Sequence, residues 1–295
     1  MKKITKLLSL IVMVALLAIV TSCRRPVEVD NRPTFTVGME CAYAPFNWTE
    51  NEKSDTNYPI DGTSFYAEGY DVQMAKKIAD ALDYRLVIKA IEWDGLIAAL
   101  ESGQIDAIIA GMSDTEERRL SVDFTASYYR STHVLVMPSN SKYLNGKTLN
   151  DFAGAKVVVQ KDTLYDSLFD QLIGANHLTP LDDVPTIITS ITSKRADITI
   201  LEEPVAKGVI ETNPNLKYIK LDSGFIVSEE DVSVAIALRK GDSELNQSIS
   251  NILNGITEDD RNALMDQAIA NNNEWWLLSY QKKLSMKIVY IYCYV

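Results

Sequence analysis

Residues 105–129 read IDAIIAGMSDTEERRLSVDFTASYY, and the rest of the chain can be interpreted outward from them. The part from Ile105 to Ala110 is apolar except for Asp106, with Gly103 before it and Gly111 after it. Short apolar runs bounded by turn residues are typical of strands that are buried on both faces of a sheet. The pattern therefore predicts a buried strand that ends at Gly111.

Residue types that favour a helix start come directly after this strand. Ser113, Asp114 and Thr115 are all common N-cap residues, and Glu117 stands three positions after Asp114, which is the spacing of a capping box. We therefore expect a helix whose first turn carries Arg118. Free backbone N–H groups, a hydroxyl and a planar guanidinium together suit a small carboxylate. The segment thus predicts a ligand-binding corner.

At this point the sequence resembles a known family. DAIIAGMSDTEERRLSVDF, residues 106–124, is similar to the strand, turn and arginine of the type 3 solute-binding proteins that serve amino-acid ABC transporters. The likeness extends over residues 35–275. It includes three further segments, VGMECAYAPFNW at 37–48, EGYDVQMAKKIADAL at 68–82 and ADITILEEPVA at 196–206. Several ordered motifs at family-like spacing make this a specific resemblance.

The resemblance implies a periplasmic-binding-protein-like fold of type II, with two α/β lobes, a two-segment hinge and a ligand cleft between the lobes. The chain then crosses between lobes near 131–138 and near 226–234. The expected parts are a lipoprotein-type signal peptide at 1–22, a tether at 23–33, a first lobe at 34–132 and 232–276, a second lobe at 137–228, and a C-terminal tail without an assigned role at 277–295.

Apolar periodicity independently predicts alternating strands and helices, and such alternation favours a mostly parallel sheet covered by helices on both faces. The stretch 49–67 has no periodicity and is expected to be a long surface loop. Strands are expected at 35–39, 86–91, 133–137, 156–160, 198–201 and 232–238. Helices are expected at 71–82, with Asp71 as the cap, and at 93–102, 163–173, 185–193, after 204, at 242–253 and at 258–270.

Composition excludes several classes of protein. The 295 residues are 46% hydrophobic and 23% charged, which is ordinary for a globular protein. The net charge is −11, and residues 1–22 contribute three lysines, so the remainder carries −14 and argues against nucleic acid as a partner. The only two histidines, His133 and His177, have no second ligand at metal spacing. We therefore expect no metal, no cofactor and no catalytic residue.

The first residues have the features of an export signal. Lysines precede an apolar run at 7–20 that is too short to span a bilayer comfortably. Residues 20–23, VTSC, resemble a lipobox, so we expect cleavage before Cys23 and lipidation of that cysteine. The alternative is an ordinary signal peptide with an incidental cysteine. We therefore expect an exported protein that is lipid-anchored to the outer face of the cell membrane, or that is periplasmic.

The resemblance also assigns roles at the ends of a bound amino acid. Arg118 stands at the position of the arginine that grips the ligand carboxylate, with Ser113 beside it as a hydroxyl donor. Glu202 stands where the family usually has an aspartate that binds the ligand ammonium. Glu203 is the alternative acid, and a solvated carboxylate at a helix start is the structural alternative. Thr163 matches a second carboxylate donor, although Asp162 replaces the glycine that usually precedes it.

Selectivity for the ligand side chain is expected from one acid and three aromatic residues of the first lobe. Aromatic faces attract cations, and Glu40 is placed to pair with a distal positive charge. For Trp93 and Phe46, ordinary core packing is the alternative. The expected ligand-binding residues are Glu40, Tyr43, Phe46, Trp93, Ala110, Gly111, Ser113, Arg118, Thr163 and Glu202.

Together these expectations describe the monomeric substrate-binding component of an amino-acid ABC importer. It would capture a cationic L-amino acid (arginine, lysine or histidine) by closing two lobes and would deliver it to the permease subunits. An amino-acid-sensing surface receptor and a dehydratase-like enzyme on the same fold are the alternatives. The residues do not identify the particular amino acid.

The lipobox generates a first prediction. Mass spectrometry of the mature protein from membranes is expected to show an acylated Cys23 as the first residue. A Cys23→Ala variant is expected to lack the acyl mass and to be recovered mainly in the soluble exported fraction, because no acyl chains remain to hold it at the bilayer. An unmodified N-terminus at another residue would contradict this assignment.

Overall fold

The computed structural model describes residues 30–272, so Cys23, the leader and the C-terminal tail lie outside the described residues. One compact unit begins at Pro33 and contains all the elements described below. In the described part, no helix is long and apolar enough to cross a membrane.

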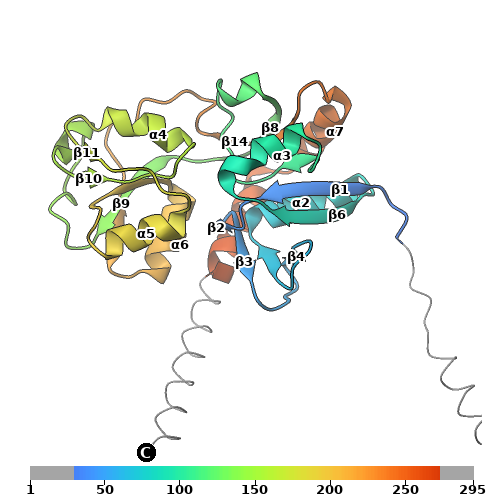
Figure 1. The fold of residues 1–295 in the computed structure, drawn as a ribbon, viewed down its shortest axis with the longest axis horizontal. Helices are drawn as coiled ribbons and strands as arrows, with labels where there is room; N and C mark the ends of the chain where they lie inside the picture. The colour runs from blue at the N-terminus through green and yellow to red at the C-terminus, as the bar shows by residue number, and fades with distance from the viewer. Residues whose placement is uncertain (1–29, 273–295) are drawn as a thin grey trace, which may run out of the picture. The chain divides into compact units, whose positions relative to one another are not determined.

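A five-stranded sheet organises the first lobe, and its strand order is β6-β1-β7-β14-β8 (Figure 1). Its strands are β1 (Thr34–Met39), β6 (Arg85–Ala90), β7 (Ala107–Ile108), β8 (Val122–Arg130) and β14 (Ser233–Arg239). β7, from the segment quoted first, is fully buried as predicted. β1 runs parallel to β6 and β7, whereas β14 is antiparallel to β7 and β8. Four of the five strands of this sheet therefore run in the same direction, as the predicted mostly parallel sheet requires, and β14 is the reversed strand.

The second lobe contains a three-stranded sheet of order β12-β9-β13. Both β12 (Thr199–Glu202) and β13 (Leu216–Ile219) are antiparallel to β9 (His133–Pro138), so the central strand is reversed relative to the two beside it. The short strands β10 (Lys156–Val157) and β11 (Asn176–His177) pair in parallel, and Val157 forms a parallel bridge with Ile198, the residue before β12. The helices α4 (Leu164–Leu168), α5 (Val184–Thr192) and α6 (Glu203–Thr212) lie where helical periodicity predicts them.

The stretch 49–67 is not the long loop that its composition predicts. It contributes to a four-stranded sheet of order β2-β3-β5-β4. The strands are β2 (Ala42–Tyr43), β3 (Asn47–Glu50), β4 (Tyr58–Pro59) and β5 (Tyr66–Glu68). Ile60 and Ala67 are buried against the first-lobe core, at 3% and 0% exposure. These apolar residues are too widely spaced to produce a strand period, so the prediction was wrong.

Helix α2 (Tyr70–Ala81) buries the predicted apolar face, but its first turn differs from the prediction. Gly69 is the N-cap, and Asp71 is fully buried. The Asp71 carboxylate accepts hydrogen bonds from Asn47 Nδ2 at 2.8 Å and from the Tyr128 hydroxyl at 2.6 Å. The same hydroxyl accepts a hydrogen bond from the backbone N–H of Gly111 at 3.1 Å. A buried network therefore fixes the turn that follows β7.

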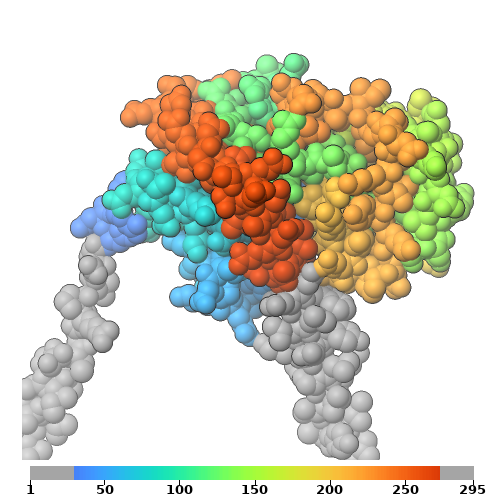
Figure 2. Space-filling model, turned by 180° about the vertical axis from the view of Figure 1, so that it is seen from behind, coloured from blue at the N-terminus to red at the C-terminus, as the bar shows by residue number. Residues whose placement is uncertain are grey.

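Three other helical segments complete the first lobe. α3 (Leu96–Glu101) follows a single 3-10 turn, Trp93–Gly95, in place of one continuous helix. α7 (Ser243–Asn254) and a helix over 258–272 come after β14. Seen from behind, residues 243–272 run in orange to red across this face beside the cyan residues of α2 (Figure 2). Residues of α7 thus pack against β8 and α2, beside the five-stranded sheet.

Candidate functional site

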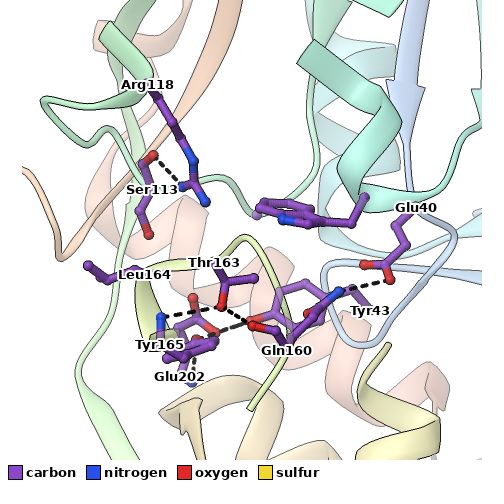
Figure 3. Close-up of a pocket in the computed structure, with 11 residues that line it drawn as sticks. Glu40, Tyr43, Ser113, Arg118, Gln160, Thr163, Leu164, Tyr165 and Glu202 are labelled. Atoms are coloured by element: carbon purple, nitrogen blue, oxygen red, sulfur yellow. Dashed lines mark hydrogen bonds between the residues drawn. The ribbon is translucent and has the colours of Figure 1, made fainter. Parts of the chain in front are cut away.

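A pocket is lined by residues between Glu40 and Arg118 on one side and between Gln160 and Glu202 on the other, and Figure 3 shows this lining. Eight of the ten predicted ligand-binding residues line it, together with three that were not predicted, Gln160, Leu164 and Tyr165. Phe46 and Ala110 do not line the pocket, since they are buried in the core at 0% and 1% exposure. The lining residues are Glu40, Tyr43, Trp93, Gly111, Ser113, Arg118, Gln160, Thr163, Leu164, Tyr165 and Glu202.

Arg118 reaches the pocket from a tight turn and not from the predicted helix. Only one 3-10 turn, Arg118–Leu120, forms here, and no side chain caps it. The Asp114 carboxylate, which was expected to cap a helix, binds the guanidinium of Arg119, with a distance of 2.6 Å to Nε. Ser113 forms a β-bridge with Val234. The helix-start anion site is therefore absent, and Arg118 is the feature of this corner that can bind an anion.

The guanidinium of Arg118 is held by neutral groups. Its Nη1 donates to the carbonyl of Ser113 at 2.9 Å, and its Nη2 donates to the carbonyl of Asp162 at 3.3 Å. The guanidinium carbon lies 5.2 Å from the centre of the Trp93 ring, in cation–π range. Burial lowers the pKa of Arg118 to about 10, so it stays charged at neutral pH. Within residues 30–272, no carboxylate forms a salt bridge with it.

Across the pocket, the second-lobe loop presents mainly backbone groups. Thr163 is the N-cap of α4; its hydroxyl accepts from the N–H of Tyr165 and donates to the carbonyl of Gln160 at 2.7 Å. Asp162 adopts φ 56°, a left-handed conformation that aspartate tolerates better than most residues, in place of the glycine usual in the family. Its carbonyl also accepts from Trp93 Nε1 at 2.9 Å. The backbone carbonyl of Asp162 is thus the group that contacts both Trp93 and Arg118.

Glu202 ends β12 and is 5% exposed. Burial raises the pKa of its carboxyl to about 8. The hydroxyl of Tyr43 donates to this carboxyl, and the hydroxyl of Tyr165 accepts from the backbone N–H of Glu202 at 3.1 Å. No lysine or arginine in the described part forms a salt bridge with Glu202. A buried acid facing a hydroxyl in this way is suited to receive an ammonium group.

Glu203, the alternative acid, faces away from the pocket lining. Its carboxylate lies 2.7 Å from Lys220 Nζ and 3.4 Å from Lys207 Nζ. Burial opposes ionisation of Glu203, but hydrogen bonds and charge from the two lysines lower its pKa overall. The geometry thus distinguishes two adjacent acids that the sequence alone left as alternatives.

The aromatic wall of the pocket rests on a glycine. Tyr43 stacks on Phe46 with ring centres 5.5 Å apart and an angle of 8° between the planes. Gly111 has φ +62°, and a Cβ atom there would lie 3.0 Å from the Tyr43 ring. A larger residue would strain the backbone and push the ring out of place. Phe46 therefore acts by supporting Tyr43 and does not line the site.

Glu40 lies at the far end of the pocket from Arg118, as Figure 3 shows. Gln160 Nε2 donates to Glu40 Oε1 at 3.0 Å and to the carbonyl of Asp182 at 2.9 Å. Burial raises the pKa of Glu40 to about 7; the hydrogen bond from Gln160 opposes this shift, while Asp183 and Glu92 add to it. A positively charged partner would stabilise the ionised form of this carboxyl, which burial disfavours.

The contacts between the two sides leave little free space. The enclosed volume is about 20 Å³, which is room for roughly one water molecule. A larger outer cavity of about 770 Å³ shares Arg118, Thr163 and Leu164 with the pocket. Its other lining residues include five acids, Glu116, Glu117, Asp162, Asp166 and Asp231. Among the residues that the structure describes, no group of three His, Cys, Asp or Glu side chains is placed to hold a metal ion.

Comparison with known proteins identifies relatives of this chain. A family model described as bacterial extracellular solute-binding proteins, family 3, matches residues 35–269. The arginine-binding extracellular protein ArtP of Bacillus subtilis (strain 168) is 29% identical over 222 residues, 74% of this chain and 78% of its own. A probable histidine-binding protein of Campylobacter jejuni is 31% identical over 199 residues, 67% of this chain and 72% of its own.

Solved structures show the same similarity. One of these is an amino acid ABC transporter substrate-binding protein, AbpA from Streptococcus pneumoniae, bound to L-arginine. It superposes with a TM-score of 0.69 and 28% sequence identity, covering 81% of this chain and 95% of its own.

The two adjacent glutamates generate a prediction about pH. A raised folded pKa means that the contribution of Glu202 to stability is complete below about pH 4.5 and is lost as pH rises through about 8. Without ligand, Glu202→Gln should exceed the parent's free energy of unfolding by less than about 1 kcal/mol at pH 5 and by about 1–4 kcal/mol at pH 8.5. Urea unfolding at both pH values measures this difference.

Glu203→Gln is the matched control. Because the folded pKa of Glu203 is lowered, its ion pairs stabilise the protein above about pH 4.5. This variant should lose at most about 1 kcal/mol at both pH values, since the pairs are partly exposed. A gain in stability for Glu203→Gln at pH 8.5, or none for Glu202→Gln, would contradict the assignment.

Proposed function

The chain belongs to the bacterial extracellular solute-binding proteins of family 3, and from this premise we propose that it captures a cationic L-amino acid between its lobes for delivery to an ABC permease. Its fold is the type II periplasmic-binding-protein fold. It is an exported amino-acid-binding protein of the ABC transport class and not an enzyme. The ligand and the permease are the parts that we propose.

One observation carries the proposal, which is the presence in one pocket of a cation without a carboxylate partner and a buried acid without a cationic partner within the described part of the chain. Arg118 is a cation whose described partners are two backbone carbonyls. Glu202 is an acid whose described side-chain partner is a hydroxyl. The carboxylate and ammonium of an α-amino acid complement these two groups, and charge-assisted hydrogen bonds are about twice as strong as neutral ones.

The positions of Arg118 and Glu202 explain why a ligand would close the two lobes. Arg118 lies in the first lobe and Glu202 in the second, by the lobe boundaries that the resemblance implies. A ligand that contacts both has more contacts in the closed form, and it therefore shifts the population toward closure. Glu202 has one more methylene than the usual aspartate, and Tyr43 fills the space between the two sides. We infer that the ligand ammonium displaces the Tyr43 hydroxyl from Glu202.

The distal end of the pocket favours a positive side chain. Glu40 is an acid with a pKa near neutrality and with no cation in salt-bridge contact in the described part. Trp93 offers a ring face that already binds a guanidinium in cation–π geometry. The acids of the outer cavity add a negative field that attracts cations, alongside the overall net charge of −11.

We also propose that lipidated Cys23 keeps the protein beside its permease, because acyl chains hold a protein at the bilayer.

A thermal-shift screen against the standard amino acids tests the proposed ligand class. A ligand at 1,000 times its Kd stabilises the folded state by about 4 kcal/mol, so the cognate amino acid should give the largest rise in Tm. Arginine, lysine or histidine is expected to rank first. Glutamine or cystine ranking above all three would contradict the role of Glu40, and the absence of any response would overturn the proposed function.

Arg118 and its neighbour Arg119 form a matched pair for a second test. Arg118→Ala should weaken binding of the cognate amino acid by about 2–5 kcal/mol, at least tenfold in Kd, because the buried ligand carboxylate loses its cation. Arg119→Ala should change Kd less than about threefold, since Arg119 pairs with Asp114 outside the pocket lining. Calorimetry measures both, and equal losses in the two variants would contradict the assigned role.

A further inference from the structure

Gln160 is a pocket residue that the predicted binding scheme does not use. It is 3% exposed and belongs to the second lobe. Its amide nitrogen donates two hydrogen bonds, one to Glu40 in the first lobe and one to the carbonyl of Asp182 beside it. The bond to Glu40 thus spans the cleft, and the bond to Asp182 orients the amide within its own lobe.

Glu40 depends on that bond in the closed form. Across residues 30–272, its carboxyl accepts this one side-chain hydrogen bond and forms no salt bridge. Lys161, the cation next in sequence to Gln160, is bound to Asp94 at 2.8 Å and to Asp182 at 2.9 Å. Leaving a buried carboxylate without a partner costs more than a hydrogen bond is worth, because the group has lost its water.

The donor comes to Glu40 only when the lobes close. By the lobe closure proposed above, the two residues separate in an open form, and water solvates Glu40. On closure Glu40 becomes partly buried, and its new partner is either a positive group on the ligand or the amide of Gln160. A ligand cation that takes this place still leaves Gln160 its bond to Asp182, so the exchange sacrifices one hydrogen bond.

We propose that Gln160 determines how wide a range of ligand side chains the site accepts, by satisfying Glu40 when the ligand brings no positive charge. This inference rests on the proposed function. With Gln160 present, an uncharged amino acid closes the lobes without leaving Glu40 unpaired. Without the amide, only a cationic ligand does so. Gln160 therefore weakens discrimination between cationic and uncharged ligands.

Replacing Gln160 by methionine tests this, because methionine has similar length and no amide donor. Calorimetry at pH 8 gives Kd for arginine and for the uncharged amino acid that stabilises the parent most. We expect the Kd ratio, uncharged over arginine, to rise at least about tenfold in Gln160→Met, mostly through weaker binding of the uncharged ligand. Lys161→Met, the neighbouring control, should leave the ratio within about twofold.

A double-mutant cycle separates this role from a structural one. In a Glu40→Gln background no carboxylate needs the amide, so adding Gln160→Met should leave the ratio unchanged. An unchanged or lower ratio in the single variant, or an equal rise in both backgrounds, would overturn the inference, as would a parent that binds no uncharged amino acid. A parent that binds neither kind of ligand would instead overturn the proposed function.

Discussion

The site depends on a guanidinium that is held between carbonyls contributed by both lobes. Arg118 donates to Ser113 on its own side and to Asp162 on the other, with the Trp93 ring beside it. Neutral oxygens orient the cation but do not neutralise it, so its charge remains available to an anion. The other features of the pocket follow from that constraint. An amino acid whose carboxylate binds Arg118 also needs a partner for its ammonium group on the other side of the cleft.

The three ionisable groups of the pocket have one feature in common, which is that a neutral group from the opposite side of the pocket contacts each of them. The contacts are Asp162 carbonyl with Arg118, Tyr43 hydroxyl with Glu202, and Gln160 amide with Glu40. Buried charges without partners would make closure costly, and these contacts lower that cost. Neutral partners are weaker than charged ones, so a ligand with matching charges can replace them. The protein can therefore close without ligand at a reduced free-energy cost, and the closed form still binds the ligand better than the neutral groups that the ligand replaces.

Elements formed by local periodicity were predictable from the sequence, whereas long-range polar pairing was not. The apolar face of α2 and the buried run of β7 follow from residues adjacent in the chain. Asp71 has the composition of a cap, yet Tyr128, 57 positions later, makes it a buried acceptor. A local pair also defeated a prediction, because Asp114 binds the nearby Arg119 and the expected helix does not form. Eight pocket residues were predicted from the resemblance. Gln160 lies next to the matched Asp162 and Thr163 but was assigned no role, and Tyr165 was not predicted, because the contacts of both residues are made across the cleft.

The change from the usual aspartate to Glu202 is best understood together with its aromatic neighbours. A longer acid alone would extend into the space where a ligand ammonium must lie. Tyr165 accepts from the backbone N–H of Glu202, which fixes the start of α6, and its hydroxyl lies 3.4 Å from that of Tyr43. Tyr43 in turn rests on Phe46 and against Gly111, whose turn is bonded to Tyr128 in the first-lobe core. The position of the acid that faces the ligand is thus set by packing that reaches into both lobes, so core substitutions far from the pocket should alter ligand affinity through Tyr43.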